Sequence, residues 1–161
     1  MTRAAKVVLL LAVALYYTLV VFNNIADPGL NIPFVQHVLS MDSTLPDNHS
    51  MWRAMTLATP FFVSIIGWES VTMGLCWWGG VRLLRAMRGT VLDFNQAKKT
   101  GIVALVLGLL MWFVAFTTVR GEWFLMWTSP KWNGEEAAFR MFTTIGIVLL
   151  FLTREDTATQ P

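Results

Sequence analysis

One carboxyl group stands out as a residue that could do chemistry. Glu69 is the only formally charged residue in the apolar stretch 60–81, which is long enough to cross a bilayer. At about 1.5 Å of rise per residue, it falls near the midplane of a ~30 Å hydrocarbon core. Burial of a carboxyl group at that depth is costly, so Glu69 needs a partner or a function.

Two interpretations of Glu69 stay open in the sequence. In the functional interpretation, Glu69 is a proton or cation relay or a polar contact to a partner subunit. In the structural interpretation, it is a protonated group whose hydrogen bond to a neighbouring helix fixes the packing register. Tyr16 and Tyr17 lie at a similar depth in the first apolar block, so we expect a tyrosine hydroxyl as donor. Thr72 shares the helix face of Glu69. Three arginines near the outer boundary would need long inward snorkelling to reach it: Arg53, Arg120 and Arg140.

Two histidines are weak candidates for a metal site. His37 and His49 lie in the first outer loop, with Asp27, Asp42 and Asp47 nearby in sequence. Such side chains can bind a transition metal, but the loop has no short ligand spacing such as HxxxH. We therefore interpret both histidines as solvated loop residues and expect no metal site.

The sequence gives little support for catalysis or for a cofactor. No apolar block contains a histidine, which disfavours a membrane haem. The single cysteine, Cys76, excludes an intrachain disulfide. We find no nucleophile–base pair, phosphate-binding loop or metal motif, so we expect no enzyme activity and no cofactor.

Composition and apolar blocks predict a polytopic membrane protein. The 161 residues are 55% hydrophobic and 14% charged, whereas soluble domains average about 25% charged residues. The apolar residues form long blocks rather than amphipathic stripes, which indicates membrane spans. We predict a single all-α domain, 1–161, with four transmembrane helices. The spans are about 7–25, 58–84, 101–120 and 137–153.

The connections between these spans carry local signals of their own. The outer loops are 26–57 and 121–136, and the cytoplasmic loop is 85–100. Within the first outer loop, Phe34, Val35, Val38 and Leu39 share one face, which predicts a short extracytoplasmic surface helix. The segment 93–96 resembles a capping box that opens the third helix.

Charge predicts the orientation. Eight basic residues lie on the side of the two termini and four on the other side, so the positive-inside rule places both termini in the cytoplasm. The basic residues sit in short loops beside apolar blocks, which argues against nucleic-acid binding. We expect the lipid bilayer as the main partner.

Two further features could serve contacts with other subunits or self-association. Gly67, Ser70 and Gly74 share a second face of the second span, for which we favour ordinary intramolecular packing over contact with another chain. Tryptophans and arginines gather in the outer loops, where they serve either a partner or the lipid interface. These outer residues are Trp52, Arg53, Trp123, Trp127, Trp132 and Arg140.

Several long stretches resemble one protein family. They are FNNIADPGLNIPFVQHVLSMD (22–42), MWRA (51–54), the glutamate of WESVT, GEWFLMW (121–127) and WNGEEAAFR (132–140). These are similar to the bacterial small integral membrane proteins of the domain-of-unknown-function family 2165. The resemblance implies a four-span protein of the bacterial inner membrane, and no particular activity. It also suggests that the outer loops pack on each other as a cap, in which Glu122 and Glu135 or Glu136 could pair with Arg53 or Arg140.

Together these features favour a non-catalytic accessory or assembly subunit of a membrane complex. The alternative is a small oligomeric transporter or proton-coupled carrier that uses Glu69. A quinone-binding or redox subunit is a third hypothesis, which lacks haem ligands in the sequence.

Overall fold

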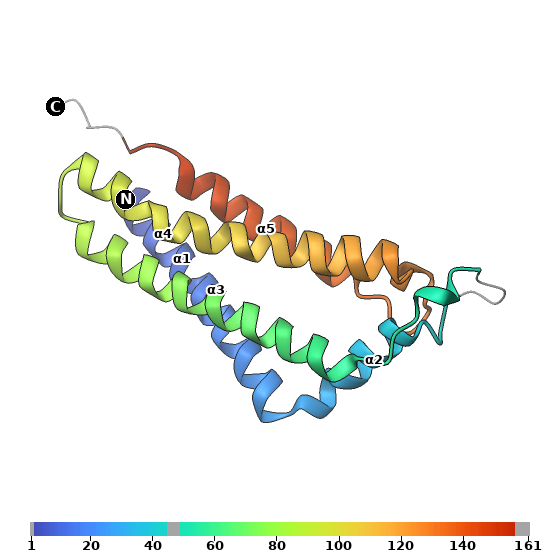
Figure 1. The fold of residues 1–161 in the computed structure, drawn as a ribbon. Helices are drawn as coiled ribbons and strands as arrows, with labels where there is room; N and C mark the ends of the chain where they lie inside the picture. The colour runs from blue at the N-terminus through green and yellow to red at the C-terminus, as the bar shows by residue number, and fades with distance from the viewer. Residues whose placement is uncertain (1, 45–48, 157–161) are drawn as a thin grey trace.

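The computed structural model describes residues 2–44 and 49–156, in which the regular secondary structure is helical and no strand is present (Figure 1). Four helical rods are long and apolar enough to cross a membrane, which confirms the predicted all-α, four-span class. The rods are α1 (Thr2–Ala26), α3 (Ala58–Ala86), α4 (Val91–Leu110) with its continuation η3 (Met111–Trp123), and α5 (Glu135–Thr153).

Short helices form the connections at one end of the bundle. They are η1 (Pro28–Leu30), α2 (Ile32–Ser40), η2 (Met51–Arg53) and η4 (Met126–Thr128). The apolar side of α2 packs against protein, because Val35, Val38 and Leu39 are buried in one cluster with Phe62 of α3 and Phe124. That α2 lies at the membrane surface stays a prediction.

The opposite end, here called the inner end, joins the start of α1 to the end of α5 (Figure 1). The ammonium group of Lys6 donates to the carbonyl of Arg154 at 2.5 Å and to the carboxylate of Asp156 at 2.7 Å. Lys98 of α4 donates to the same two groups. The side chain of Arg3 also donates to the carbonyls of the α3–α4 turn. All four rods are therefore tied together at this end, since Met87 is the C-cap residue of α3.

The start of α4 corrects the predicted capping box. The N-cap residue is Thr90 rather than Asp93, and Asp93 is the third residue of the helix. The Thr90 hydroxyl accepts from the Asp93 amide at 3.1 Å, and the Thr90 amide donates to the Asp93 carboxylate at 3.1 Å. A capping box pairs an N-cap hydroxyl with an acid three residues later, and only Thr90 supplies that hydroxyl here.

Glycines bring the helices into close contact in the inner half. A Cβ atom on Gly79 of α3 would lie 2.7 Å from the backbone nitrogen of Gly101 in α4. In contrast, Cβ atoms on Gly67 and Gly74 would meet nothing within 4 Å, and both residues are exposed. The favoured interpretation of these two glycines as intramolecular packing residues is therefore wrong, because no other part of the described chain packs against them.

The second half of the third rod is wider than the α-helix that its sequence predicts. In η3 the backbone hydrogen bonds reach back five residues instead of four. The hydroxyls of Thr117 and Thr118 follow the same spacing and donate to the carbonyls five residues earlier. Helices of this kind are rare and often occur at functional sites.

Candidate functional site

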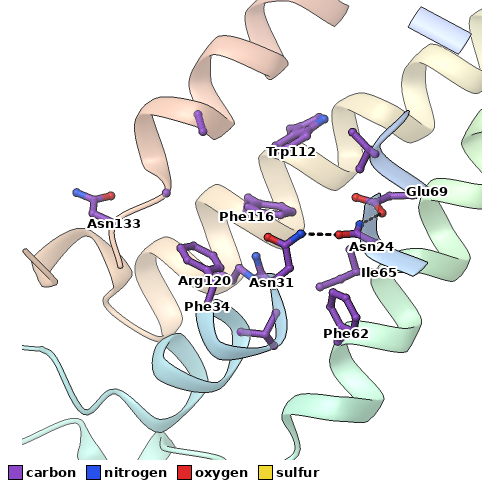
Figure 2. Close-up of a pocket in the computed structure, with 14 residues that line it drawn as sticks. Asn24, Asn31, Phe34, Phe62, Ile65, Glu69, Trp112, Phe116, Arg120 and Asn133 are labelled. Carbon is purple, nitrogen blue, oxygen red and sulfur yellow. Dashed lines mark hydrogen bonds between the residues drawn. The ribbon is translucent and has the colours of Figure 1, made fainter. Parts of the chain in front are cut away.

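A cavity of about 390 Å³ lies in the outer half of the bundle (Figure 2). Residues of α1, α3, η3 and the start of α5 line it, and α2 contributes Phe34 and Val35. Its wall combines aromatic rings with amides, one carboxyl group and one guanidinium group. Cavities with a mostly apolar wall and a few polar groups are the usual form of a small-molecule site.

Glu69 lies on this cavity and is 3% exposed. The amide nitrogen of Asn24 donates to its Oε2 atom at 2.7 Å, and Asn31 donates to the Oδ1 atom of Asn24 at 2.6 Å. The buried stripe of α1 runs through Tyr17 and Val21 to Asn24, which brings this amide to Glu69. Figure 2 shows the three side chains in a row.

The tyrosines do not supply the hydrogen bond that we expected for Glu69. Tyr17 is 1% exposed, and its hydroxyl makes no well-formed hydrogen bond with the described residues. Tyr16 packs edge-on against Tyr17, with ring centroids 5.4 Å apart. Thr72 is buried, and its hydroxyl donates to the carbonyl of Trp68 at 2.9 Å. Asn24 replaces the tyrosines because it lies about two helical turns further toward the outer end of α1.

A second charged residue, Arg120, faces the cavity, although its sequence position placed it at the outer boundary. Arg120 of η3 is 6% exposed, and its guanidinium carbon lies 4.3 Å from the Phe116 ring and 5.3 Å from the Phe34 ring. Within the described chain it forms no ion pair, since Glu69 and every other carboxylate lie beyond 4.0 Å. The spacing Trp112–Phe116–Arg120 was the available signal, because these residues form one column on η3.

The outer loops pack on each other as a cap, which confirms that prediction. Trp52 and Trp123 meet edge-to-face at 5.9 Å, and Arg53 lies over both rings and donates to the Trp123 carbonyl at 3.3 Å. On the other side of the cap, Trp132 stacks on His37 at 4.5 Å. The predicted tryptophan group therefore divides into two clusters.

The predicted ion pairs at the outer rim are wrong. Neither Arg53 nor Arg140 pairs with a glutamate among the described residues, where the ion pairs are Lys6–Asp156, Lys98–Asp156 and His37–Asp42. Tryptophan rings hold Arg53 instead. Trp127 is 49% exposed and Arg140 is exposed, and neither joins the two clusters.

The histidines do not come together. His37 bonds Asp42 at 2.7 Å, and His49 is exposed elsewhere in the loop. Asp47 lies outside the described residues. Across residues 2–44 and 49–156, no group of three potential metal-ligating side chains is present.

An apolar groove, formed by three hollows, follows the face between α3 and the third rod. The first hollow, about 390 Å³, lies beside Gly67 and Trp68; the second, about 380 Å³, shares Ser64 and Trp68 with it. The third, about 520 Å³, shares Phe61 and Val119 with the second and ends at Trp123. The indole nitrogen of Trp68 donates to the Leu107 carbonyl at 3.1 Å and crosses the groove floor.

Comparison with known proteins identifies a family. The family model described as "Predicted small integral membrane protein (DUF2165)" matches residues 2–155. No curated protein and no solved structure matches the chain significantly.

Proposed function

This chain belongs to the DUF2165 family of small integral membrane proteins, and on that premise we propose that it is a non-catalytic accessory or assembly protein. In this proposal the apolar groove between α3 and the third rod receives one transmembrane helix of a partner subunit. The observation that carries the proposal is the continuity of that groove from Gly67 to Trp123.

The inner part of the groove suits a close helix–helix contact. Gly67 lines the innermost hollow, and Gly74 lies two helical turns further along the same face of α3, beyond that hollow. Both glycines are exposed, and nothing in the described chain covers them. Small residues at such positions let two helix backbones approach closely inside a membrane. The hollows themselves are almost entirely apolar, which matches the surface of a helix that lies in lipid.

The outer part of the groove ends at a cluster suited to partner recognition. Trp52 is 73% exposed and Trp123 is 48% exposed, and Arg53 is held between them. Tryptophan and arginine are the residues most enriched at interface hot spots. We expect Trp123→Ala to weaken partner binding by at least about 2 kcal/mol, roughly thirtyfold.

The orientation and the membrane belong to the same proposal. We place the protein in the bacterial inner membrane, with the inner end of the bundle in the cytoplasm. The excess of basic residues at that end supports this orientation.

Site-specific photo-crosslinking tests the groove. A photoreactive residue is placed at Gly67, and a matched control at Ile147, which is 62% exposed on α5 away from the groove. We expect one discrete protein adduct from position 67 in native membranes and none from position 147. Gly74→Leu should abolish the adduct without lowering the thermal stability of the purified protein.

The identity of the adduct decides the outcome. A membrane protein other than this chain supports the proposal, provided that Trp123→Ala also weakens the crosslink. An adduct of twice the chain mass would show self-association and overturn the role as an accessory to another protein. Crosslinks to lipid alone would overturn the groove as a docking site.

A proton-coupled carrier is the second candidate, because Glu69 is buried on a polar cavity. The close Gly79–Gly101 contact in the inner half opposes a path through this single bundle. Glu69→Gln keeps the side-chain shape and removes the ionisable group. The test measures protonophore-sensitive uptake of a substrate into vesicles. If the uptake rate is the same in this variant as in the wild type, Glu69 is excluded as the coupling group.

A further inference from the structure

The cavity in Figure 2 presents one acidic and one basic side chain that form no ion pair with each other. Glu69 accepts one hydrogen bond, from Asn24, and no other described side chain donates to it. Arg120 makes only aromatic contacts, although a guanidinium group carries five N–H donors. A buried charge without a polar partner is costly, so both groups favour a ligand that brings the missing partners.

The size of the cavity is that of a small organic group rather than of one bridging water. A water molecule takes about 30 Å³ in the liquid, and the cavity holds about 390 Å³. Its remaining wall is formed largely by Phe34, Phe62 and Phe116. A ligand must therefore offer polar ends to the two charges and an apolar middle to the rings.

We propose that this cavity binds a zwitterionic group, with its anion on Arg120 and its primary ammonium on Glu69. The anion would take the free N–H donors of the guanidinium group in a planar, two-point contact. The ammonium would donate to the carboxyl group that Asn24 already orients. The cavity and the middle hollow of the groove share Ile65 and Arg120 in their walls. The inference does not require a partner helix in the groove, because the remaining polar groups of the site, Glu69 and Asn24, line the cavity alone.

The cavity mouth is polar. Asn31 and Asn133 are exposed on its outer side, and the exposed Ala137 begins the lipid-facing side of α5. The same zwitterionic chemistry can thus come from a free small molecule or from the head group of a lipid such as phosphatidylethanolamine. The experiment separates these two sources.

Thermal stability of the purified protein measures binding. In detergent, the probes are phosphoethanolamine, ethanolamine alone and inorganic phosphate alone. We expect phosphoethanolamine to raise the melting temperature at concentrations at least about tenfold lower than either half. In nanodiscs, phosphatidylcholine with and without phosphatidylethanolamine tests the lipid source. A response in detergent indicates a free ligand, and a response confined to nanodiscs indicates the lipid.

Paired variants test the two assigned contacts. Glu69→Gln should lose the preference for the zwitterion over phosphate, whereas Arg120→Gln should lose the response to every anionic probe. Glu136→Gln and Arg140→Gln change exposed charges that do not line the cavity, and both variants should bind as the wild type does.

Three results would overturn the assignment. They are phosphate binding as tightly as the zwitterion, an unchanged zwitterion response in Glu69→Gln, and the absence of any response in both detergent and nanodiscs. Each variant is first checked for a monodisperse elution profile. If Arg120→Gln fails this check, Arg120→Lys serves instead, with a weakened anion response expected because lysine lacks the planar fork.

Discussion

A single amide links two helices through the buried carboxyl group. Asn24 donates to Glu69 and accepts from Asn31, so both ends of its side chain are used. An amide is well suited to this place because it has a donor and an acceptor at the same depth. The contact therefore fixes the outer half of α1 against α3 and the turn that follows α1.

Removal of this amide should destabilise the protein. We expect Asn24→Ala to lower the free energy of unfolding by about 1–3 kcal/mol, because the Glu69 carboxyl group loses its donor inside the bundle. The melting temperature in detergent measures the effect. Asn23→Ala is the control, since Asn23 is exposed. Equal melting temperatures for the two variants would show that the Asn24–Glu69 bond contributes little.

Asp156 is the residue that holds the inner end together. Burial by itself raises the pKa of Asp156, but the hydrogen bonds and charges of Lys6 and Lys98 outweigh it and hold that pKa below its ordinary value of 3.8. A depressed carboxyl pKa stabilises the fold above the unfolded-state pKa. This stabilisation is lost as the pH falls through the pKa of the folded state.

Asp156→Asn should therefore act in a pH-dependent manner. Near neutral pH we expect the free energy of unfolding to fall by about 1–3 kcal/mol, because the ammonium groups of Lys6 and Lys98 lose their counter-charge. The difference in melting temperature between wild type and variant should shrink below about pH 4. Glu155→Gln is the control, because it removes one negative charge from the exposed neighbouring position. A difference that stays constant down to about pH 3 would contradict the role assigned to the carboxylate.

At the scale of helices, close backbone contact decides which glycines matter. Gly79 of α3 faces Gly101 of α4 so closely that a side chain on either one would meet backbone or the Leu10 side chain. The α3–α4 pair is thus held by small residues that allow close approach. Gly74, on the same helix, faces open space.

Two glycine variants on one helix give a matched comparison. Gly79→Ala should lower the free energy of unfolding by about 1–3 kcal/mol, since the backbone of α4 has to move away from the added methyl group. Gly74→Ala should be neutral or stabilising by up to about 1 kcal/mol, because alanine is the better helix former. Melting temperatures in detergent compare them. Equal losses in both variants would contradict the packing described for the inner half.

The helices were more predictable from the sequence than the site. Long apolar blocks predict spans because only helices can satisfy the backbone within lipid. The cavity depends on side chains from separate helices, so the spacing of Trp112, Phe116 and Arg120 could place these three on one face but could not show that this face turns toward Glu69. Arg120 was placed at the outer boundary by its sequence position, and its burial depends on Phe34 of α2. The widening of η3 likewise has no signal in apolar periodicity.

At the scale of the molecule, the arrangement of its ends makes the proposed orientation testable. Cys76 is fully buried, so Cys76→Ala gives a chain without cysteines. We expect Trp127→Cys in this background to react with an impermeant maleimide in intact cells whose outer membrane has been permeabilised. Leu92→Cys, at a position 66% exposed on α4, should react only after the inner membrane is opened. The reverse labelling pattern would show that the protein has the opposite orientation in the membrane.

The contrast between the two halves of the bundle has a mechanical consequence. Glycine contacts and the Asp156 cluster hold the helices together in the inner half, while the cavity and the groove lie in the outer half. We therefore expect a ligand in the cavity to shift the outer ends of the helices and to leave the inner end in place. A partner bound in the groove would then respond to occupancy of the cavity, whereas a partner bound at the inner end would not.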